Sequence, residues 1–157
     1  MISIISDILL TIAILTTAVI YGTDIFHALV MRKATALSKD DSIIDLVGHT
    51  HLIADKRMPA IGITSVICTS VSIILNLTHA WSAGLLSGAL LMLLFHLYLY
   101  MTIAKPINTI MSDAAVKNFV PDNTRALQNR WESAINYRAA FLMAAMLMLV
   151  IAAVFTA

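Results

Sequence analysis

Residues 8–31 read ILLTIAILTTAVIYGTDIFHALVM, and this stretch decides the fold of the chain. It is longer than the roughly 20 residues that an α-helix needs to cross the hydrocarbon core of a bilayer. Asp24 is its one charged side chain. In lipid the backbone N–H and C=O groups must be paired within the segment, so a single spanning stretch has to be helical. We therefore predict a transmembrane helix over residues 8–31.

Three further apolar stretches of similar length follow, at residues 59–78, 81–104 and 134–155. The chain of 157 residues is 60% hydrophobic and 12% charged, with a mean hydropathy of +0.89. Soluble domains are closer to about half apolar and about a quarter charged, so lipid must solvate much of this surface. The sequence thus predicts an all-α protein, in which residues 1–157 form a single transmembrane domain built as a four-helix bundle.

The basic residues lie on one side of the predicted membrane. Five Lys and Arg residues fall within residues 32–58, between the first and second spans, and four within residues 105–133, between the third and fourth. The N-terminus, the short turn at residues 77–80 and the C-terminal tail carry none. Loops rich in Lys and Arg stay in the cytoplasm. We expect a protein integral to the cytoplasmic membrane, with these two segments inside and both termini outside.

The first cytoplasmic segment has the pattern of an amphipathic helix. Apolar residues recur there with His51 and Asp55 at helical spacing, which predicts an additional helix at the membrane surface over residues 40–55. This helix would turn His51 and Asp55 toward the bundle and His49 toward water. Pro59 is expected in the first turn of the second span.

The second cytoplasmic segment is expected to lead directly into the fourth span. The sequence PDNT at residues 121–124 is typical of a helix start. The helix would then begin ahead of the membrane, with Leu127, Trp131 and Arg138 on one stripe.

Gly84 and Gly88 form a small-xxx-small pattern in the third span. Such a pattern allows two helix backbones to approach closely. It serves either helix packing inside the monomer or a homo-oligomer that docks through both glycines.

Polar side chains inside the spans gather toward the cytoplasmic end. Asp24 and His27 share a face of the first span, and His96 and Tyr100 lie one helical turn apart in the third. The outer half of the bundle is expected to be almost purely apolar. A charge in lipid is costly, and it is normally paired or functional. We therefore expect Asp24 to pair with Arg138 of the fourth span.

Three chemistries suit these residues, and the sequence leaves the choice of cofactor open. Asp24, His27 and His96 could bind iron or copper, since a carboxylate-x-x-His pair on a bundle helix is a known ligand arrangement. His27 and His96 could instead hold a haem between two helices. In the third case no cofactor is present, and His, Asp and Tyr side chains act as acid–base groups on a bound apolar substrate.

Four motifs carry a family resemblance: YGTDIF at residues 21–26, DKRMP at 55–59, PIN at 106–108, and LQNRWES at 127–133 followed by Arg138. In this order and spacing they resemble the anthrone oxygenase-like family of small membrane proteins. The resemblance covers almost the whole chain. It implies four spans and an oxygenase activity, because the named members oxidise an anthrone to an anthraquinone. Most bacterial members, to which this sequence is most similar, have no assigned activity.

The expected function is that of a membrane oxidoreductase or oxygenase, which acts on an apolar aromatic or quinone-like molecule at a polar site near the inner leaflet. Asp24, His27, His96 and Arg138 are the candidate catalytic residues. Asp24 or His27 would take the substrate proton, and Arg130 or Arg138 would stabilise the developing phenolate or peroxide charge. The candidate substrate-binding residues are His51, Tyr100, Asn108, Arg130 and Trp131.

The alternative is a non-enzymatic membrane anchor or partner-binding subunit, whose cytoplasmic segments recognise another protein. A transporter ranks last, because the outer half is expected to offer no polar groups to line a path. The net charge of +1 provides no basic field for nucleic acid. The expected partners are membrane lipid and a hydrophobic small molecule.

Overall fold

The computed structural model describes residues 2–156, and helices account for almost all of them. No strand occurs within that range, so the predicted all-α class is confirmed. In the chain order below, η marks a π-helical turn. The elements are α1 (Ile2–Phe26), η1 (His27–Met31), α2 (Arg32–Leu37), α3 (Asp40–Ile43), η2 (Ile44–Gly48), α4 (His49–Leu75), α5 (Ala80–Leu99), η3 (Tyr100–Ala104), α6 (Lys105–Val116), α7 (Thr124–Ser133) and α8 (Ile135–Thr156).

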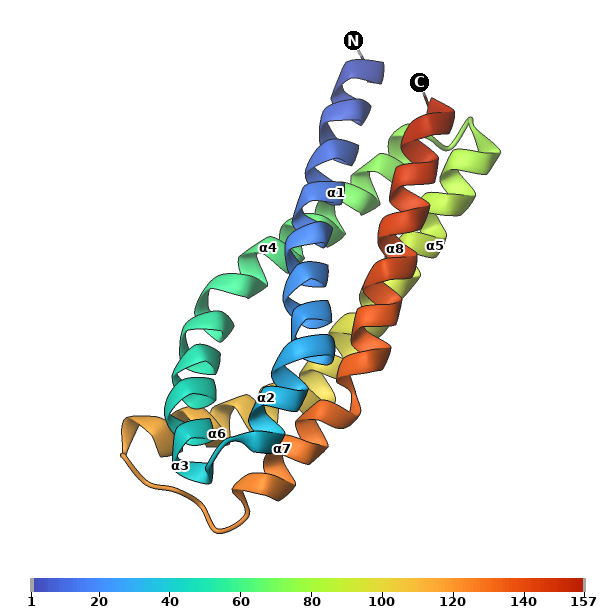
Figure 1. Cartoon of the computed structure of the whole chain (residues 1–157). Coiled ribbons are helices and arrows are strands. Elements are labelled where there is room, and N and C mark those ends of the chain that lie inside the picture. Colours follow the sequence, from blue (N-terminus) through green and yellow to red (C-terminus); the bar gives the residue numbers. More distant parts are fainter. Residues whose placement is uncertain (1, 157) are drawn as a thin grey trace.

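Consecutive elements join into four long helical runs. Each run overlaps one of the predicted spans, and each is long and apolar enough to cross a membrane. The runs lie together as a bundle, with both ends of the chain at one end and α2, α3, α6 and α7 at the other (Figure 1). The runs are Ile4–Leu37, Asp40–Leu75, Ala80–Val116 and Thr124–Phe155.

The separate surface helix predicted over residues 40–55 is not found. Asp40–Leu75 is one helical run, and Pro59 lies inside α4 instead of in its first turn. A proline removes a backbone hydrogen bond and bends a helix; Figure 1 shows that the axis of α4 changes direction along its length. The helix continues through Pro59, and Met58 and Ile61 on either side of it pack against the core. The predicted sides of this helix are confirmed, since His51 is buried in the bundle and His49 is exposed.

The half of the bundle near the chain termini has an apolar core that contains small polar groups. Leu86, Leu142 and Leu149 are fully buried in it. Thr17 and Ser65 share a hydrogen bond of 2.6 Å between α1 and α4. The prediction of an almost purely apolar outer half is wrong. It rested on the hydropathy of the spans, in which the many Ile and Val residues outweigh the small hydroxyl groups. The buried polar residues here are Ser6, Thr17, Ser65, Thr69, Ser72, Asn76 and Ser82.

The two glycines of the third span have different environments. A Cβ atom at Gly88 would lie 2.9 Å from the Met148 sulfur, so this glycine allows α5 to approach α8. A Cβ atom at Gly84 would have no described atom within 4 Å. Packing inside the monomer therefore uses Gly88, and a homo-oligomer that docked through both glycines would have to displace Met148.

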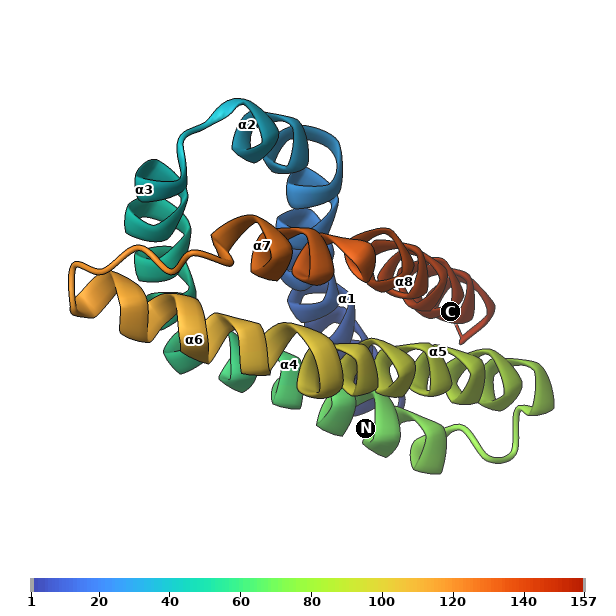
Figure 2. The same cartoon turned by 90° about the horizontal axis from the view of Figure 1, so that it is seen from below.

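A second core lies at the end of the bundle opposite the termini. It joins η2, α6 and α7, and it includes Val47, Met111 and Trp131. In Figure 2, α7 lies between α2 and α6 at this end. As predicted, α7 begins at Thr124. This core holds Trp131 against the rings of His27 and His51.

Candidate functional site

A buried ion pair joins the first and last helices of the bundle. Arg138 Nη2 in α8 donates to Asp24 Oδ1 in α1 at 2.8 Å, and the two side chains are 7% and 6% exposed. The predicted pairing of Asp24 with Arg138 is confirmed. His96 Nε2 in α5 lies 3.2 Å from the second oxygen, Asp24 Oδ2. Both carboxylate oxygens of Asp24 therefore have a partner.

A chain of hydrogen bonds leads from Tyr100 to Trp131 in the second core. Asp55 Oδ1 accepts from the Tyr100 hydroxyl at 2.8 Å and from Asn108 Nδ2 at 2.9 Å. Asn108 Oδ1 accepts from Trp131 Nε1 at 2.7 Å. Tyr100, Asn108 and Trp131 were predicted to line the site, and the structure connects them through Asp55. Asp55 was expected to face the bundle but was not assigned to the site.

The indole of Trp131 is the common neighbour of three basic side chains. The ring centroid of His27 lies 4.4 Å from that of Trp131, and the centroid of His51 lies 5.3 Å away. The guanidinium carbon of Arg138 lies 5.3 Å from the same indole and 5.8 Å from the Tyr100 ring. Such distances permit cation–π attraction, which holds the guanidinium between two aromatic rings.

Four nitrogen atoms in this group have no hydrogen-bond partner among the described residues, although they are buried. They are His27 Nε2, His51 Nε2, Arg138 Nε and Arg138 Nη1. A buried donor without a partner costs roughly 1–3 kcal/mol. Natural proteins leave few such groups, and those that remain call for a water, an ion or a functional role. The four atoms are therefore the groups for which a water, an ion or a ligand would supply the missing partner.

The helices that carry these residues are locally irregular. His27 is the first residue of η1, Tyr100 is the first residue of η3, and His51 follows η2 by one turn of helix. A π-helical turn inserts one extra residue into an α-helix, and such turns occur frequently at functional sites. Here they change which side chains face the centre of the bundle.

A second polar group lies closer to the end of the bundle. Glu132 Oε1 accepts from the Thr35 hydroxyl at 2.8 Å and from Gln128 Nε2 at 2.7 Å. Arg32 lies 3.7 Å from the other oxygen of Glu132. Sequence reasoning missed Glu132 and Gln128, because a polar residue in a cytoplasmic segment is normally exposed. Their spacing in the sequence could have indicated them. Gln128 and Glu132 lie one helical turn apart, directly after Leu127 and Trp131, and all four side chains are on the buried face of α7.

Arg130 was predicted to bind substrate, but the structure places it on the exposed side of α7. Each residue of a helix is rotated by about 100° from the one before it. The buried face of α7 extends from Leu127 and Trp131 to Gln128 and Glu132. Arg130 is rotated from Trp131 in the opposite direction, so it faces away from it. Of the two candidate arginines, Arg138 alone reaches the buried group.

Asp24, His27 and His96 do not form a metal-ligand set. Among residues 2–156, no group of three or more His, Cys, Asp or Glu side chains is arranged to hold a metal ion. Asp24 and His96 bond to each other, whereas His27 lies against Trp131. A haem iron held between His27 and His96 would also have to take His96 from Asp24. His27 Nε2 has no hydrogen-bond partner among the described residues, whereas His96 Nε2 is bonded to Asp24.

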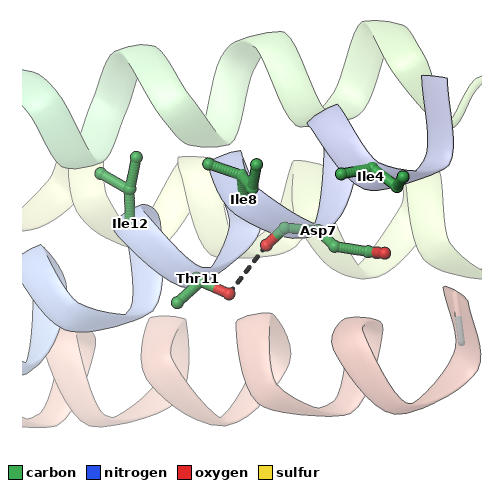
Figure 3. A pocket seen from close by; sticks show the side chains of 5 residues that line it. All are labelled: Ile4, Asp7, Ile8, Thr11 and Ile12. Atoms are coloured by element: carbon green, nitrogen blue, oxygen red, sulfur yellow. Dashed lines mark hydrogen bonds between the residues drawn. The ribbon is translucent and has the colours of Figure 1, made fainter. Parts of the chain in front are cut away.

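Two surface hollows lie away from this group. One, of about 270 Å³, runs beside α1 near its N-terminal end; Figure 3 shows Ile4, Ile8 and Ile12 around it, with the Thr11 hydroxyl bonded to the Asp7 carbonyl. The other, of about 210 Å³, lies beside the second core, where Asp41 and Asp45 line it together with the end of α6. Neither hollow is lined by Asp24, His27, His96 or Arg138.

Comparison of the chain with known protein families, with characterised proteins and with solved structures gave no match. The resemblance to the anthrone oxygenase-like family therefore stays a prediction that rests on the quoted motifs.

Proposed function

We propose that this chain is an integral protein of the cytoplasmic membrane that oxidises an apolar aromatic or quinone-like molecule near the inner leaflet. The observation that carries the proposal is the buried pair of Asp24 and Arg138 beside the unpartnered nitrogen of His27. An ionisable group inside a membrane segment is by default a candidate for function. An imidazole with a free nitrogen is the most common general base in enzymes.

In this proposal, His27, Arg138 and Asp24 have different roles. His27 Nε2 takes a proton from the substrate, and the free N–H groups of Arg138 stabilise the negative oxygen that results. Asp24 is a positioning residue, because its oxygens already accept from Arg138 and His96. Dioxygen is the oxidant. A ring methylene becomes a carbonyl when dioxygen supplies its oxygen atom and the second oxygen leaves as water with both methylene protons.

Turnover of an anthrone tests the proposal. Purified protein in detergent is mixed with the anthrone in air, and anthraquinone absorbance and oxygen consumption are followed against empty micelles. We expect a rate above the background, and His27→Gln should reduce the excess rate by about 100-fold or more. Arg130→Gln is the matched control, because this arginine is exposed, and it should leave the rate unchanged. A folded wild-type protein with only the background rate would contradict the proposal.

The second candidate is a partner-binding subunit without catalysis. The hollow of about 210 Å³ beside the second core favours this candidate, because Asp41 and Asp45 lie there beside exposed Phe119. Carboxylates next to an exposed aromatic ring suit a basic amphipathic segment of another protein. The same assay separates the two candidates, since a binding subunit would give the background rate and the His27 variant would make no difference.

A further inference from the structure

The half of the bundle near the chain termini contains a polar face on α4. Four buried side chains recur there at intervals of four, three and four residues, which places them on one side of the helix. They are Ser65, Thr69, Ser72 and Asn76. Toward the opposite end of the bundle, the same stripe reaches Asp55 and His51. Polar groups along the depth of a membrane helix mark paths for ions and protons. A transporter ranks last on the sequence because this half was expected to lack polar groups, and the stripe removes that objection.

Two hydrogen bonds hold the stripe against α1. Thr17 and Ser65 share a hydrogen bond of 2.6 Å, and Asn76 Nδ2 donates to Ser6 Oγ at 2.8 Å. Ser6 and Thr17 are eleven residues apart on α1, and Ser65 and Asn76 are eleven residues apart on α4. The two helices therefore run antiparallel in a single register between these bonds, with the polar side chains in the seam between them.

The two hydroxyl groups between these bonds have no partner. Thr69 Oγ1 and Ser72 Oγ are buried without a hydrogen bond among the described residues, and both side chains are 0% exposed. In the antiparallel register, Ala13 lies across from Thr69 and Leu10 across from Ser72, and neither can donate or accept. A buried hydroxyl without a partner destabilises a fold, and an internal water molecule is its common partner.

Water is the ligand that suits this seam. A hydroxyl group both donates and accepts, so Thr69 and Ser72 can bind one water between them and leave it free to bond to a second. Leu10 and Ala13 are buried as well, so the helices are packed too closely for an organic solute or a hydrated metal ion. A row of hydroxyls and waters can still pass a proton, because each oxygen accepts on one side and donates on the other.

An apolar contact separates this row from the buried ion pair. A Cβ atom at Gly62 would lie 3.5 Å from Ile20 Cδ1, so these two residues meet across the seam. Asp24 follows Ile20 by one helical turn on the same side of α1, and its carboxylate is bonded to Arg138 and His96. A short apolar constriction between two polar regions can gate a path by excluding water.

We infer that the seam between α1 and α4 holds water and conducts protons between the end with the chain termini and Asp24, with Ile20 as its constriction. Beyond Asp24, the half-buried Asp55 continues the stripe of α4 toward the opposite end. Each O–H bond that forms along the row is matched by one that breaks, so one positive charge crosses and no electron moves. The inference goes beyond the proposed function and does not depend on it, because no substrate is oxidised.

Proton flux into liposomes tests the inference. The purified protein is reconstituted into liposomes that contain potassium and a pH-sensitive dye, and valinomycin lets potassium compensate the charge that protons carry. The wild type and Ile20→Ala are each measured with and without the pair Thr69→Val and Ser72→Ala. The matched control pair is Thr64→Val with Ser70→Ala, on the same helix, because these two hydroxyls bond to carbonyl groups of α4 itself.

We expect the wild type to conduct protons faster than protein-free liposomes, and Ile20→Ala to conduct faster still because a smaller side chain widens the constriction. Loss of the Thr69 and Ser72 hydroxyls should return both proteins to the background, whereas the control pair should leave the flux unchanged. Flux in Ile20→Ala alone would support the path with Ile20 as a closed gate. Background flux in both starting proteins, or flux that survives loss of the two hydroxyls, would overturn the inference.

Thermal unfolding in detergent gives a reading that is independent of flux and of anthrone oxidation. If a water pairs with both hydroxyls, Thr69→Val and Ser72→Ala should each lower the Tm, and the double variant should lose less than the sum because the water is shared. In a dry seam, each substitution removes an unpartnered group and raises the Tm. Unchanged or higher Tm values in both single variants would show that no water is bound and would overturn the inference.

Discussion

At the scale of single residues, the stability of the bundle depends on the buried pair of Asp24 and Arg138. Their side chains are almost fully buried and 2.8 Å apart. Removal of one partner leaves an uncompensated charge in a low-dielectric layer. We expect Asp24→Asn or Arg138→Gln alone to lower the free energy of unfolding by about 3–5 kcal/mol.

The double variant tests whether the two effects have one cause. If the pair is the cause, Asp24→Asn with Arg138→Gln should recover a large part of the loss, because no buried charge remains. Unfolding in detergent, followed by circular dichroism, measures all four proteins. Losses that simply add would show that the two side chains do not stabilise each other.

His27 and His96 should respond differently to the same substitution. His96 bonds to Asp24, so His96→Ala removes a hydrogen bond to a charged group and should cost about 1.5–3 kcal/mol of stability. The Nε2 atom of His27 has no partner, so His27→Ala loses mainly ring contacts with Trp131. We expect His27→Ala to lower stability less than His96→Ala and to lower ligand binding more. Equal effects of both variants on both measurements would contradict this division.

The sequence predicted the members of the site better than their contacts. Asp24, with its partner Arg138, could be predicted because a buried charge in a span needs a partner. Arg130 was included because it is next to Trp131 in sequence, but the stripe of Leu127 and Trp131 leaves it on another face of the helix, where the structure has it exposed. Asp55 was left out of the site because its two bonds, to Tyr100 and Asn108, join helices whose relative depth no local pattern fixes.

At the scale of the elements, close approach of helices depends on individual glycines. A Cβ atom at Gly48 would lie 2.5 Å from the Met111 carbonyl oxygen and 2.7 Å from Ala115 Cβ in α6. Neither contact can yield without movement of the helix backbone. We expect Gly48→Ala to destabilise the protein by about 1–3 kcal/mol, as overpacking of a core does.

Gly84→Ala is the matched control for that substitution. Both glycines are helical, but a Cβ atom at Gly84 has no described atom within 4 Å. Alanine favours a helix over glycine by about 1 kcal/mol, so Gly84→Ala should be neutral or stabilising. The difference between the two variants in thermal unfolding reports the contact between η2 and α6. Similar effects of both would mean that the two elements do not approach as closely as this structure has them.

The elements also show where local pattern fails. Periodicity correctly predicted that residues 40–55 are helical and which side of them is buried. The preference of proline for the first turn of a helix wrongly predicted that a new helix begins near Pro59. Pro59 lies inside α4 because tertiary packing on both sides outweighs the loss of one backbone bond, and no local rule contains that packing. The π-helical turns were not predicted either, since an inserted residue has no compositional signature.

At the scale of the whole molecule, the basic residues are concentrated at one end of the bundle. The end with α2, α3, α6 and α7 contains the two segments that hold nine of the ten Lys and Arg residues. The opposite end holds both ends of the chain and the turn between α4 and α5 (Figure 1). Arg125 links the two segments, because it bonds to Asp40 and to the carbonyl of Thr35. The two segments must therefore lie on the same side of a membrane.

This geometry gives a sharp test of orientation. In a Cys68→Ala background, single cysteines replace Lys39, Lys117 and His79, which are all exposed. By the positive-inside rule, we expect a membrane-impermeant maleimide to label His79→Cys on intact cells and the other two only after permeabilisation. Unmodified protein is the control, since Cys68 is buried and should stay unlabelled. Labelling of Lys39→Cys and Lys117→Cys from opposite sides would contradict the bundle itself, because the bonds of Arg125 require both segments in one compartment. Labelling of both from outside would keep the bundle and reverse its direction, and the polar site would then face the outer leaflet.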